Sequence, residues 1–560
     1  MHGRVKVRTS AEQAEIKRKE RQKQAQQFAA VKNKIFTLRA EGSHAPEAMD
    51  MTARLLEQNP DVATLFNYRR EILLHNKKDM TEEEYAGKIK EELQLSTTCL
   101  KRNPKSYSAW HHRRWCVLQV GGEDVLQQEL ALTTRYLGLD ERNFHCWDYR
   151  RFVVSQIPPE AQAKIDEKQF AKVAADVDKV VENFSNYSAW HYRSKLLMAE
   201  HSVQFGLELP AAVWKEELAL VTDPIFIDPV DQSSWIYLQW LLTPRPAPAR
   251  PRVVFLHNRT LVIVCDQPVK VADAITITSG DDGGARVCVQ SSSCVGRSGA
   301  VWTLHLAEHC PAVTITAAEC DGSDGSQPPL VTGAIEVRQD GLWRSAAAAV
   351  TALPERVQGV VDMLLELLAD LTETDMRACL QTLAYAYTTH VPDAADTKRL
   401  CLQWFTQLQT ADPLRRGFYR EMCSRLNIAQ QLSEADDDTT LSLSSLHLSC
   451  LDGIESACHA KYVDVSDNAL TTLARLSVLP RVESVNASGN HISTLDMAWF
   501  QGLSSLQRVD VRNNPITSVC NAATAAPPLP RVEVHIGGGA VQVSADVVDA
   551  LKSAGWTVIV

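Results

Sequence analysis

The chain has 560 residues, which is too long for a single hydrophobic core, so we expect about three or four domains. Its 58 basic and 68 acidic residues give a formal net charge of −10, which excludes a broadly basic nucleic-acid-binding surface. The 14 cysteines form no CxxC motif and no even framework, no apolar stretch approaches the length of a transmembrane segment, and the N-terminus does not read as a signal peptide. These features predict a soluble cytoplasmic protein with free thiols.

Residues 1–40 are rich in Lys, Arg, Gln and Glu, and Ser10 can cap a long helix that we expect from about Ala11 to Ala40. A charge run of this kind is usually a solvated helix face, and a dedicated binding arm is the alternative. Only the second half of the helix has enough apolar surface to dock, through Phe28, Val31, Ile35, Phe36 and Leu38.

A tryptophan recurs at Trp110, Trp147, Trp190 and Trp235, with spacings of 37, 43 and 45 residues, and Phe66 occupies the same slot 44 residues earlier. A period of roughly 34 to 47 residues is typical of solenoids built from helical hairpins. The surrounding segments are NPDVATLFNYRR (59–70), NPKSYSAWHHRR (103–114), DERNFHCWDYRR (140–151), NFSNYSAWHYR (183–193) and DPVDQSSWIY (228–237). The repeat therefore predicts a solenoid of helical hairpins.

Each repeat opens with a turn sequence such as Asn-Pro or Asp-Pro, so the tryptophan should lie early in the second helix of its hairpin. Between the turns, apolar residues recur at helical spacing, as at Val173, Val177 and Val181. We expect the tryptophans to be buried wedges between stacked hairpins. The repeated arginines should form ion pairs between repeats or cap neighbouring turns, at Arg113, Arg114, Arg150 and Arg151.

The proline-rich segment 244–251 ends the helical pattern. Turn sequences then separate about seven short apolar runs, which predict a small antiparallel sandwich inserted at 244–344. It is immunoglobulin-like in architecture only, because the chain lacks a convincing Cys–Trp–Cys spacing. The expected strands are 252–256, 261–265, 274–278, 285–289, 301–306, 312–317 and 333–337.

The helical pattern resumes at 345–435, in the runs 360–371, 378–390 and 397–408, and a second repeat follows an acidic linker. The segments 463–473, 485–495 and 509–519 align Asn468, Asn490 and Asn513, which is typical of leucine-rich repeats whose asparagines tie stacked turns together. Residues 441–449 look like a degenerate first unit. A cap should follow, with strands at 532–536 and 556–560 and a helix near 544–553.

The motif N-Y-x-x-W-x-x-R runs from Tyr107 to Arg113, with Phe144 to Arg150 and Tyr187 to Arg193 as further copies. These units resemble the repeats of protein prenyltransferase alpha subunits. The order of domains, over essentially the whole chain, resembles the type II enzymes that geranylgeranylate Rab GTPases, and the opening MHGRVKVRTSAEQAE is also similar. The resemblance implies a multidomain α-α superhelix of helical-hairpin repeats (1–243 and 345–435) with an inserted immunoglobulin-like β-sandwich (244–344) and a C-terminal leucine-rich repeat domain with a cap (440–560).

Further, the resemblance implies a transferase that is active only with a beta subunit, which holds Zn²⁺ and most of the isoprenoid pocket. Geranylgeranyl would pass from its diphosphate to C-terminal cysteines of Rab GTPases presented by an escort protein. The chain itself has no HExxH motif or Cys/His cluster. A non-catalytic solenoid adaptor is the alternative. An alpha subunit shared by the farnesyl and type I enzymes is disfavoured, because that resemblance offers neither the sandwich nor the leucine-rich repeats.

Three residues are the candidates for this chain's share of the chemistry. A diphosphate leaving group gains negative charge, which a preorganised cation and a hydroxyl donor stabilise. By the resemblance, Lys105 contacts the diphosphate, and Tyr107 and His145 face the active site. A neutral imidazole can accept a hydrogen bond from a phenol, so we expect His145 to orient Tyr107. Without the resemblance, Lys105 reads as a solvated turn lysine and His145 as a packing histidine.

His2 is a speculative metal ligand. A mobile terminus that carries an imidazole could reach the zinc of the partner subunit as a reversible extra ligand. A lone terminal histidine is more often solvated, and that alternative stays open.

Overall fold

The computed structural model describes residues 11–157, 184–201, 209–244, 250–265, 275–279, 287–294, 300–317, 334–345, 352–373, 375–392, 394–434, 439–521, 532–538 and 543–560. His2, Ser10 and the predicted helical run around Val173 to Val181 lie outside these residues. The chain divides into two compact units, Met1–Glu200 and His201–Val560, and each is described by itself.

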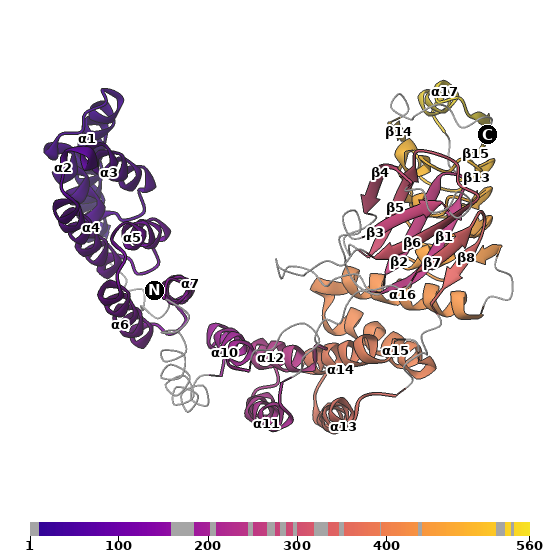
Figure 1. The fold of residues 1–560 in the computed structure, drawn as a ribbon, viewed down its shortest axis with the longest axis horizontal. Helices are drawn as coiled ribbons and strands as arrows, with labels where there is room; N and C mark the ends of the chain where they lie inside the picture. The colour runs from indigo at the N-terminus through magenta and orange to yellow at the C-terminus, as the bar shows by residue number, and fades with distance from the viewer. Residues whose placement is uncertain are drawn as a thin grey trace. The chain divides into compact units, whose positions relative to one another are not determined.

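The described residues of the first unit are almost all helical (Figure 1). The predicted long helix is confirmed as α1 (Ala11–Ala40). Three hairpins follow: α2 (Pro46–Gln58) with α3 (Ala63–Asn76), α4 (Glu82–Arg102) with α5 (Tyr107–Val120), and α6 (Glu123–Leu139) with α7 (Phe144–Ser155). A short 3₁₀ turn, η1 (Lys77–Asp79), precedes α4, and α10 (Tyr187–Glu200) is the second helix of the fourth repeat. Side-chain caps at Thr81, Ser106 and Asn143 begin α4, α5 and α7.

The repeated tryptophans are structural, as predicted. Trp110 is 5 % exposed, Trp147 9 %, Trp190 1 % and Trp235 2 %. In each of these four repeats the indole N–H donates a hydrogen bond to the carbonyl six residues earlier, at 2.8 to 2.9 Å. The tryptophan therefore fills the space between helices and also fixes the turn that opens its own repeat.

Buried ion pairs join consecutive hairpins, which confirms the inter-repeat pairs expected for Arg113. Its guanidinium donates two hydrogen bonds to Glu129 of the next hairpin, at 2.6 and 2.7 Å. Arg69 pairs in the same way with Glu92, at 2.8 and 2.5 Å. Both arginines also reach the first helix of their own hairpin, so each one bridges three helices. Burial requires such pairing, since an unpaired charge in the core is costly.

The predicted return of helices is confirmed in the second unit. Its hairpins are α11 (Ala211–Ile227) with α12 (Gln232–Leu242), α13 (Glu355–Asp370) with α14 (Arg377–His390), and α15 (Ala395–Ala411) with α16 (Arg416–Glu434), the last joined through η2 (Pro413–Arg415). Helix α12 packs directly on α14, where Gln239 donates to Thr382 at 3.0 Å. The strands between them in sequence are thus an insertion in a continuous helical stack.

The insertion contains two antiparallel sheets. The larger has the order β4-β5-β2-β1-β8, and the smaller has the order β3-β6-β7. Their bounds are β1 (Pro251–His257), β2 (Thr260–Cys265), β3 (Ile275–Ser279), β4 (Val289–Cys294), β5 (Val301–Leu306), β6 (Ala312–Ala317), β7 (Ile335–Arg338) and β8 (Leu342–Arg344). The bounds expected for the strand at 285–289 are wrong, because the strand in this region is β4 at Val289–Cys294 and residues 287 and 288 precede it; residues 285 and 286 lie outside the described residues. As an exposed edge strand β4 is polar, so its sequence carries no apolar signal.

The described residues of 439–560 form a solenoid, called the C-terminal coil below, in which successive turns each add one parallel strand to a sheet. The strand order in this sheet is β16-β15-β13-β11-β10-β9. These strands are β9 (Thr440–Ser442), β10 (Tyr462–Asp464), β11 (Ser484–Asn486), β13 (Arg508–Asp510), β15 (Glu533–His535) and β16 (Thr557–Ile559). A second parallel pair, β12 (Thr494–Asp496) and β14 (Ser518–Cys520), lies along the coil, with η3 (Ile454–Ala457), η4 (Ala474–Val478), η5 (Met497–Phe500) and α17 (Ala545–Ser553) in the connections.

Asparagine side chains tie the stacked turns together, but one predicted member is wrong. Asn468, Asn490 and Asn514 are 7 %, 2 % and 2 % exposed, and each amide donates to three backbone carbonyls. The predicted Asn513 is exposed and has a φ of 57°, so it occupies the turn before the ladder. The interval from Asn490 to the next ladder residue is thus one residue longer than expected, because that residue is Asn514 and not Asn513.

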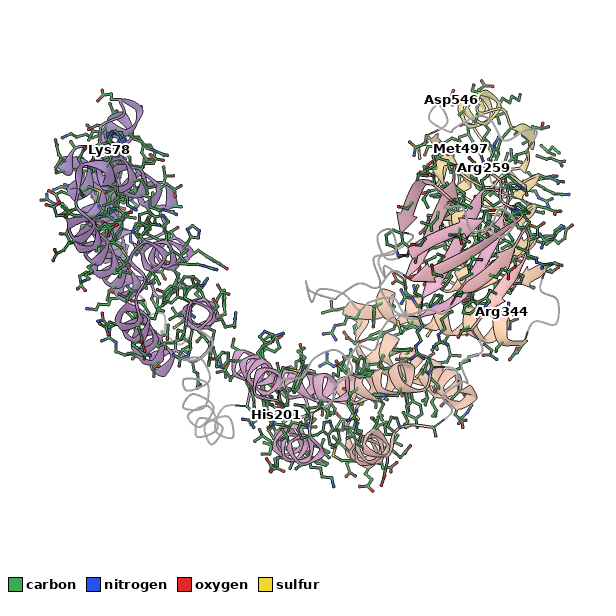
Figure 2. All side chains as sticks on the ribbon, viewed as in Figure 1. Lys78, His201, Arg259, Arg344, Met497 and Asp546 are labelled. Carbon is green, nitrogen blue, oxygen red and sulfur yellow. The ribbon has the colours of Figure 1, made fainter. Side chains whose placement is uncertain are left out.

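The outer face of the larger sheet packs against this coil. Val253 and Phe255 of β1 belong to the same buried cluster as Phe500 and Leu503 of the coil. At the edge of this contact, the His257 imidazole lies 3.0 Å from the Ser505 hydroxyl. Figure 2 shows the side chains of both layers, with Arg259 of the β1–β2 turn and Met497 of the coil labelled. Strands β1 and β2 are thus buried on both faces, which explains their unbroken apolar sequences.

Candidate functional site

The turns that open the second helices share one geometry. In four of them an Asn or Asp side-chain oxygen accepts a hydrogen bond from the backbone N–H two residues later, at 3.1 to 3.2 Å. These residues are Asn59, Asn103, Asp140 and Asp228, and they share φ values of −138° to −148° and ψ values of 85° to 93°. Asparagine and aspartate thus serve equally well in this Asx turn.

Successive turns are tied to one another by the residue that caps the second helix. The Asn143 amide donates to the Pro104 carbonyl at 2.9 Å, and the Asn186 amide donates to the Glu141 carbonyl at 3.1 Å. Each of these oxygens also accepts the indole N–H of its own repeat. One carbonyl therefore joins the turn, the buried tryptophan and the next repeat, so residues on neighbouring turns have fixed relative positions.

Lys105 lies on such a turn, and its side chain is 50 % exposed. Its ammonium is 3.1 Å from the Asp140 carboxylate on the next turn. The side chain is therefore neither buried nor a freely solvated turn lysine, because a specific partner from the following repeat holds it at the surface.

Tyr107 and His145 come together from consecutive repeats. Their rings meet edge to face with centroids 4.2 Å apart, and the Tyr107 residue is 70 % exposed while His145 is 8 % exposed. The expected hydrogen bond from the phenol to the imidazole is not formed. The Tyr107 hydroxyl has no hydrogen-bond partner among the residues that the structure describes, so it remains available as a donor.

Burial lowers the pKa of His145, and the nearby positive charge of Lys105 lowers it further. The imidazole is consequently neutral near pH 7. The three predicted site residues thus form one cluster: an ammonium from one turn, a phenol from the helix after it, and a neutral imidazole from the next repeat. Such a cluster can stabilise negative charge that develops on a bound oxyanion.

The neighbouring histidines serve different purposes. His112 is fully buried in the slot that tyrosine fills in the other repeats, and its Nε2 lies 3.0 Å from Glu92. His111 is exposed on the other side of α5. Across the described ranges, no group of three or more His, Cys, Asp or Glu side chains could hold a metal ion. His2 lies outside these ranges.

Asp140 and the buried glutamates are not among the residues predicted from the sequence. Asp140 follows α6 at the Asx-turn position, and only the packing of two repeats reveals that Lys105 is its partner. A signal for the glutamates was present, because Glu92, Glu129 and Glu217 each lie 18 residues before a repeated tryptophan. That constant offset places a carboxylate beside the aromatic slot of the same hairpin, where Tyr149 donates to Glu129 at 2.7 Å.

The repeats match a known family model. The protein prenyltransferase alpha subunit repeat matches residues 45–76, 89–120, 126–157 and 177–200. The first range covers α2 and α3, the second begins within α4 and covers α5, the third begins within α6 and covers α7, and the fourth ends with α10. Hairpin α11–α12 lies outside the matched ranges, yet Trp235 donates to the Pro229 carbonyl at 2.9 Å and Tyr237 donates to Glu217 at 2.5 Å. The helical repeats are thus those of a protein prenyltransferase alpha subunit.

Relatives that match most of the chain show which kind of prenyltransferase alpha subunit it resembles. The chain is 32 % identical over 536 residues to the geranylgeranyl transferase type-2 subunit alpha of Sus scrofa and equally to that of Homo sapiens, with 92 % of this chain and 91 % of each relative covered. The Candida albicans protein of the same name is 34 % identical over 270 residues, which cover 43 % of this chain and 73 % of the relative. The chain belongs to the family of geranylgeranyl transferase type-2 alpha subunits. None of the helices in the described ranges is both long and apolar enough to cross a membrane.

Proposed function

We propose that this chain is the alpha subunit of a heterodimeric protein geranylgeranyltransferase type II and is active only with a beta subunit. The observation that carries the proposal is the 32 % identity to the pig relative over 92 % of the chain, because that match spans both the helices and the strands. The reaction is transfer of geranylgeranyl from geranylgeranyl diphosphate to C-terminal cysteine thiols of Rab GTPases, which an escort protein presents in the cytoplasm.

In this proposal Lys105, Tyr107 and His145 act on the diphosphate leaving group. The Lys105 ammonium binds the diphosphate and stabilises the charge that grows as the carbon–oxygen bond breaks. The Tyr107 hydroxyl, which is unpaired among the described residues, donates to a second diphosphate oxygen. His145 packs against the ring of Tyr107 at a centroid distance of 4.2 Å and so positions it as a neutral group.

Zn²⁺ belongs, in the same proposal, to the beta subunit. A zinc ion lowers the pKa of a bound cysteine thiol and so supplies the thiolate nucleophile. His2 of this chain would be at most a reversible extra ligand of that ion, as its imidazole could bind only in the neutral form.

In the same proposal the chain is divided into domains. We assign 1–243 and 345–435 to the helical repeat domain, 244–344 to an immunoglobulin-like sandwich and 440–560 to a leucine-rich repeat domain with a cap. The two antiparallel sheets and the ladder of Asn468, Asn490 and Asn514 support these assignments.

Coexpression with a beta subunit tests the proposal. The pair should copurify and transfer labelled geranylgeranyl to a Rab GTPase when escort protein is present, and neither subunit alone should do so. A stable lone chain that gains no transferase activity with any beta subunit would instead support the adaptor alternative and overturn the proposal.

A further inference from the structure

Lys105 and Asp140 occupy a contact that recurs between repeats. In the preceding pair of turns, the amide of Asn103 donates to the Asp61 carboxylate at 3.0 Å. Asp61 and Lys105 are the equivalent third residues of their turns, and Asn103 and Asp140 are the equivalent first residues. The stacking of repeats therefore brings the third residue of one turn against the first residue of the next turn. In the pair formed by Lys105 and Asp140, the third residue is a cation.

We infer that Asp140 is a positioning residue for the transferase reaction, which holds the Lys105 ammonium at the place where the diphosphate leaves. The inference rests on the proposed function. Lysine has a long flexible stem, and a cation stabilises a transition state best when it is already in place. The carboxylate lies 3.1 Å from the ammonium in an ion pair, and an ammonium has three N–H donors that it can offer to phosphate oxygens.

The exposure of the pair sets the size of the effect. The side chains of Lys105 and Asp140 are 50 % and 37 % exposed, so solvent screens their attraction. A pair of this kind shifts a local equilibrium by at most about fivefold. Asp140 can therefore order the lysine and still release it towards a diphosphate.

The turn geometry provides a variant that removes only the charge. Asp140 Oδ1 accepts the N–H of Arg142 at 3.2 Å, and the asparagines at 59 and 103 make the same bond at 3.2 and 3.1 Å. Asp140→Asn therefore keeps the turn. Asp228→Asn is the matched control, since Asp228 makes the same bond but the third residue of its turn is Val230.

The test uses the holoenzyme of this chain and its beta subunit. Asp140→Asn should lower kcat for geranylgeranyl transfer about threefold to fivefold without raising the KM for geranylgeranyl diphosphate, since it also removes a negative charge near that substrate. Acylation of Lys105, measured by peptide mass spectrometry, should become faster by a similar factor. Asp228→Asn should change neither quantity, and Asp140→Asn should add nothing in a Lys105→Ala background.

The outcomes separate the two proposals. An inactive wild-type holoenzyme would contradict the proposed function itself. An active wild type whose kcat is unchanged by Asp140→Asn, or lowered by the same factor when Lys105 is already alanine, would overturn the positioning role. Faster acylation of Lys105 with unchanged kcat would make the pair a surface contact without a part in the reaction.

Discussion

The amide of Asn143 donates a 2.9 Å hydrogen bond to the carbonyl of Pro104 in the preceding repeat. The Asn143 side-chain oxygen also accepts from the backbone N–H groups of His145 and Cys146, so the same residue caps α7. One asparagine therefore holds the start of the helix that bears His145 against the turn that bears Lys105.

Asn143→Ala should loosen this junction. It removes both the cap and the link between repeats, which together are worth about 1 to 2 kcal/mol. Hydrogen exchange at the start of α7 in the full chain should become roughly tenfold faster. Ser108→Ala is the control, because the hydroxyl of Ser108 makes only a 3.5 Å contact at the surface. Equal exchange in the wild type and Asn143→Ala would show that the link does not hold the turns together.

Glu129→Gln should destabilise the first unit strongly. The Arg113 guanidinium is 4 % exposed and loses its countercharge, and a buried charge without a partner costs about 3 to 5 kcal/mol. The thermal unfolding midpoint should fall by several degrees and expression should drop. Glu15→Gln, in a pair that is exposed on α1, should leave both unchanged. If the two variants behave alike, the inter-repeat ion pair is not a stabilising element.

His112 should make the first unit sensitive to mild acid. Burial lowers the pKa of His112 below its usual 6.5 and outweighs the opposing effect of Glu92. As pH falls below 6.5 the unfolded chain binds a proton that the folded chain refuses, so stability is present above 6.5 and is lost below it. Glu92 does not titrate in this window. Burial raises the pKa of Glu92, but the hydrogen bonds from His112 and Arg69 outweigh burial and lower the pKa to about 2.

The check is the loss in unfolding midpoint between about pH 7.5 and about pH 5.5. This loss should be smaller in His112→Gln, whose amide can still donate to Glu92 but does not titrate. An identical loss in both proteins would mean that His112 does not account for the pH dependence.

The asparagine ladder offers a pair of adjacent residues with opposite expectations. Asn514→Ala removes a side chain that donates to three carbonyls and accepts from the Ile492 N–H, so it should cost about 1 to 3 kcal/mol. Asn513→Gly should be nearly neutral, because φ at this position is 57° and glycine adopts it freely. Limited proteolysis of the C-terminal coil measures both, and the reverse order would restore Asn513 to the ladder.

Spacing in the sequence predicts much of this architecture. The interval between tryptophans places Trp110 and Trp147 early in the second helices, because a large aromatic at a constant period has few uses other than packing between repeats. The same reasoning fails for Asn513 and Asn514, since two adjacent asparagines both fit a period that varies by a residue. Only the φ value and the burial decide which one lies inside the coil.

The candidate site also has a part that the sequence predicts and a part that only the structure reveals. Lys105, Tyr107 and His145 could be predicted from the family motif, and the structure brings them together. The partner of Lys105 could not, because Asp140 is 35 residues away and the contact exists only once two turns stack. Similarly, the runs at β1 and β2 are apolar on both faces, but the sequence does not say that the C-terminal coil covers the outer one.

The most direct test of the account is the single-turnover rate of geranylgeranyl transfer by Lys105→Ala in the holoenzyme. We expect a decrease of about tenfold to a hundredfold with unchanged affinity for the Rab and escort proteins, since the leaving group carries most of its new charge in the transition state. Lys101→Ala, at an exposed lysine in the last turn of α4, should retain the wild-type rate. A wild-type rate for Lys105→Ala would contradict the central claim that this turn supplies the chain's share of the chemistry.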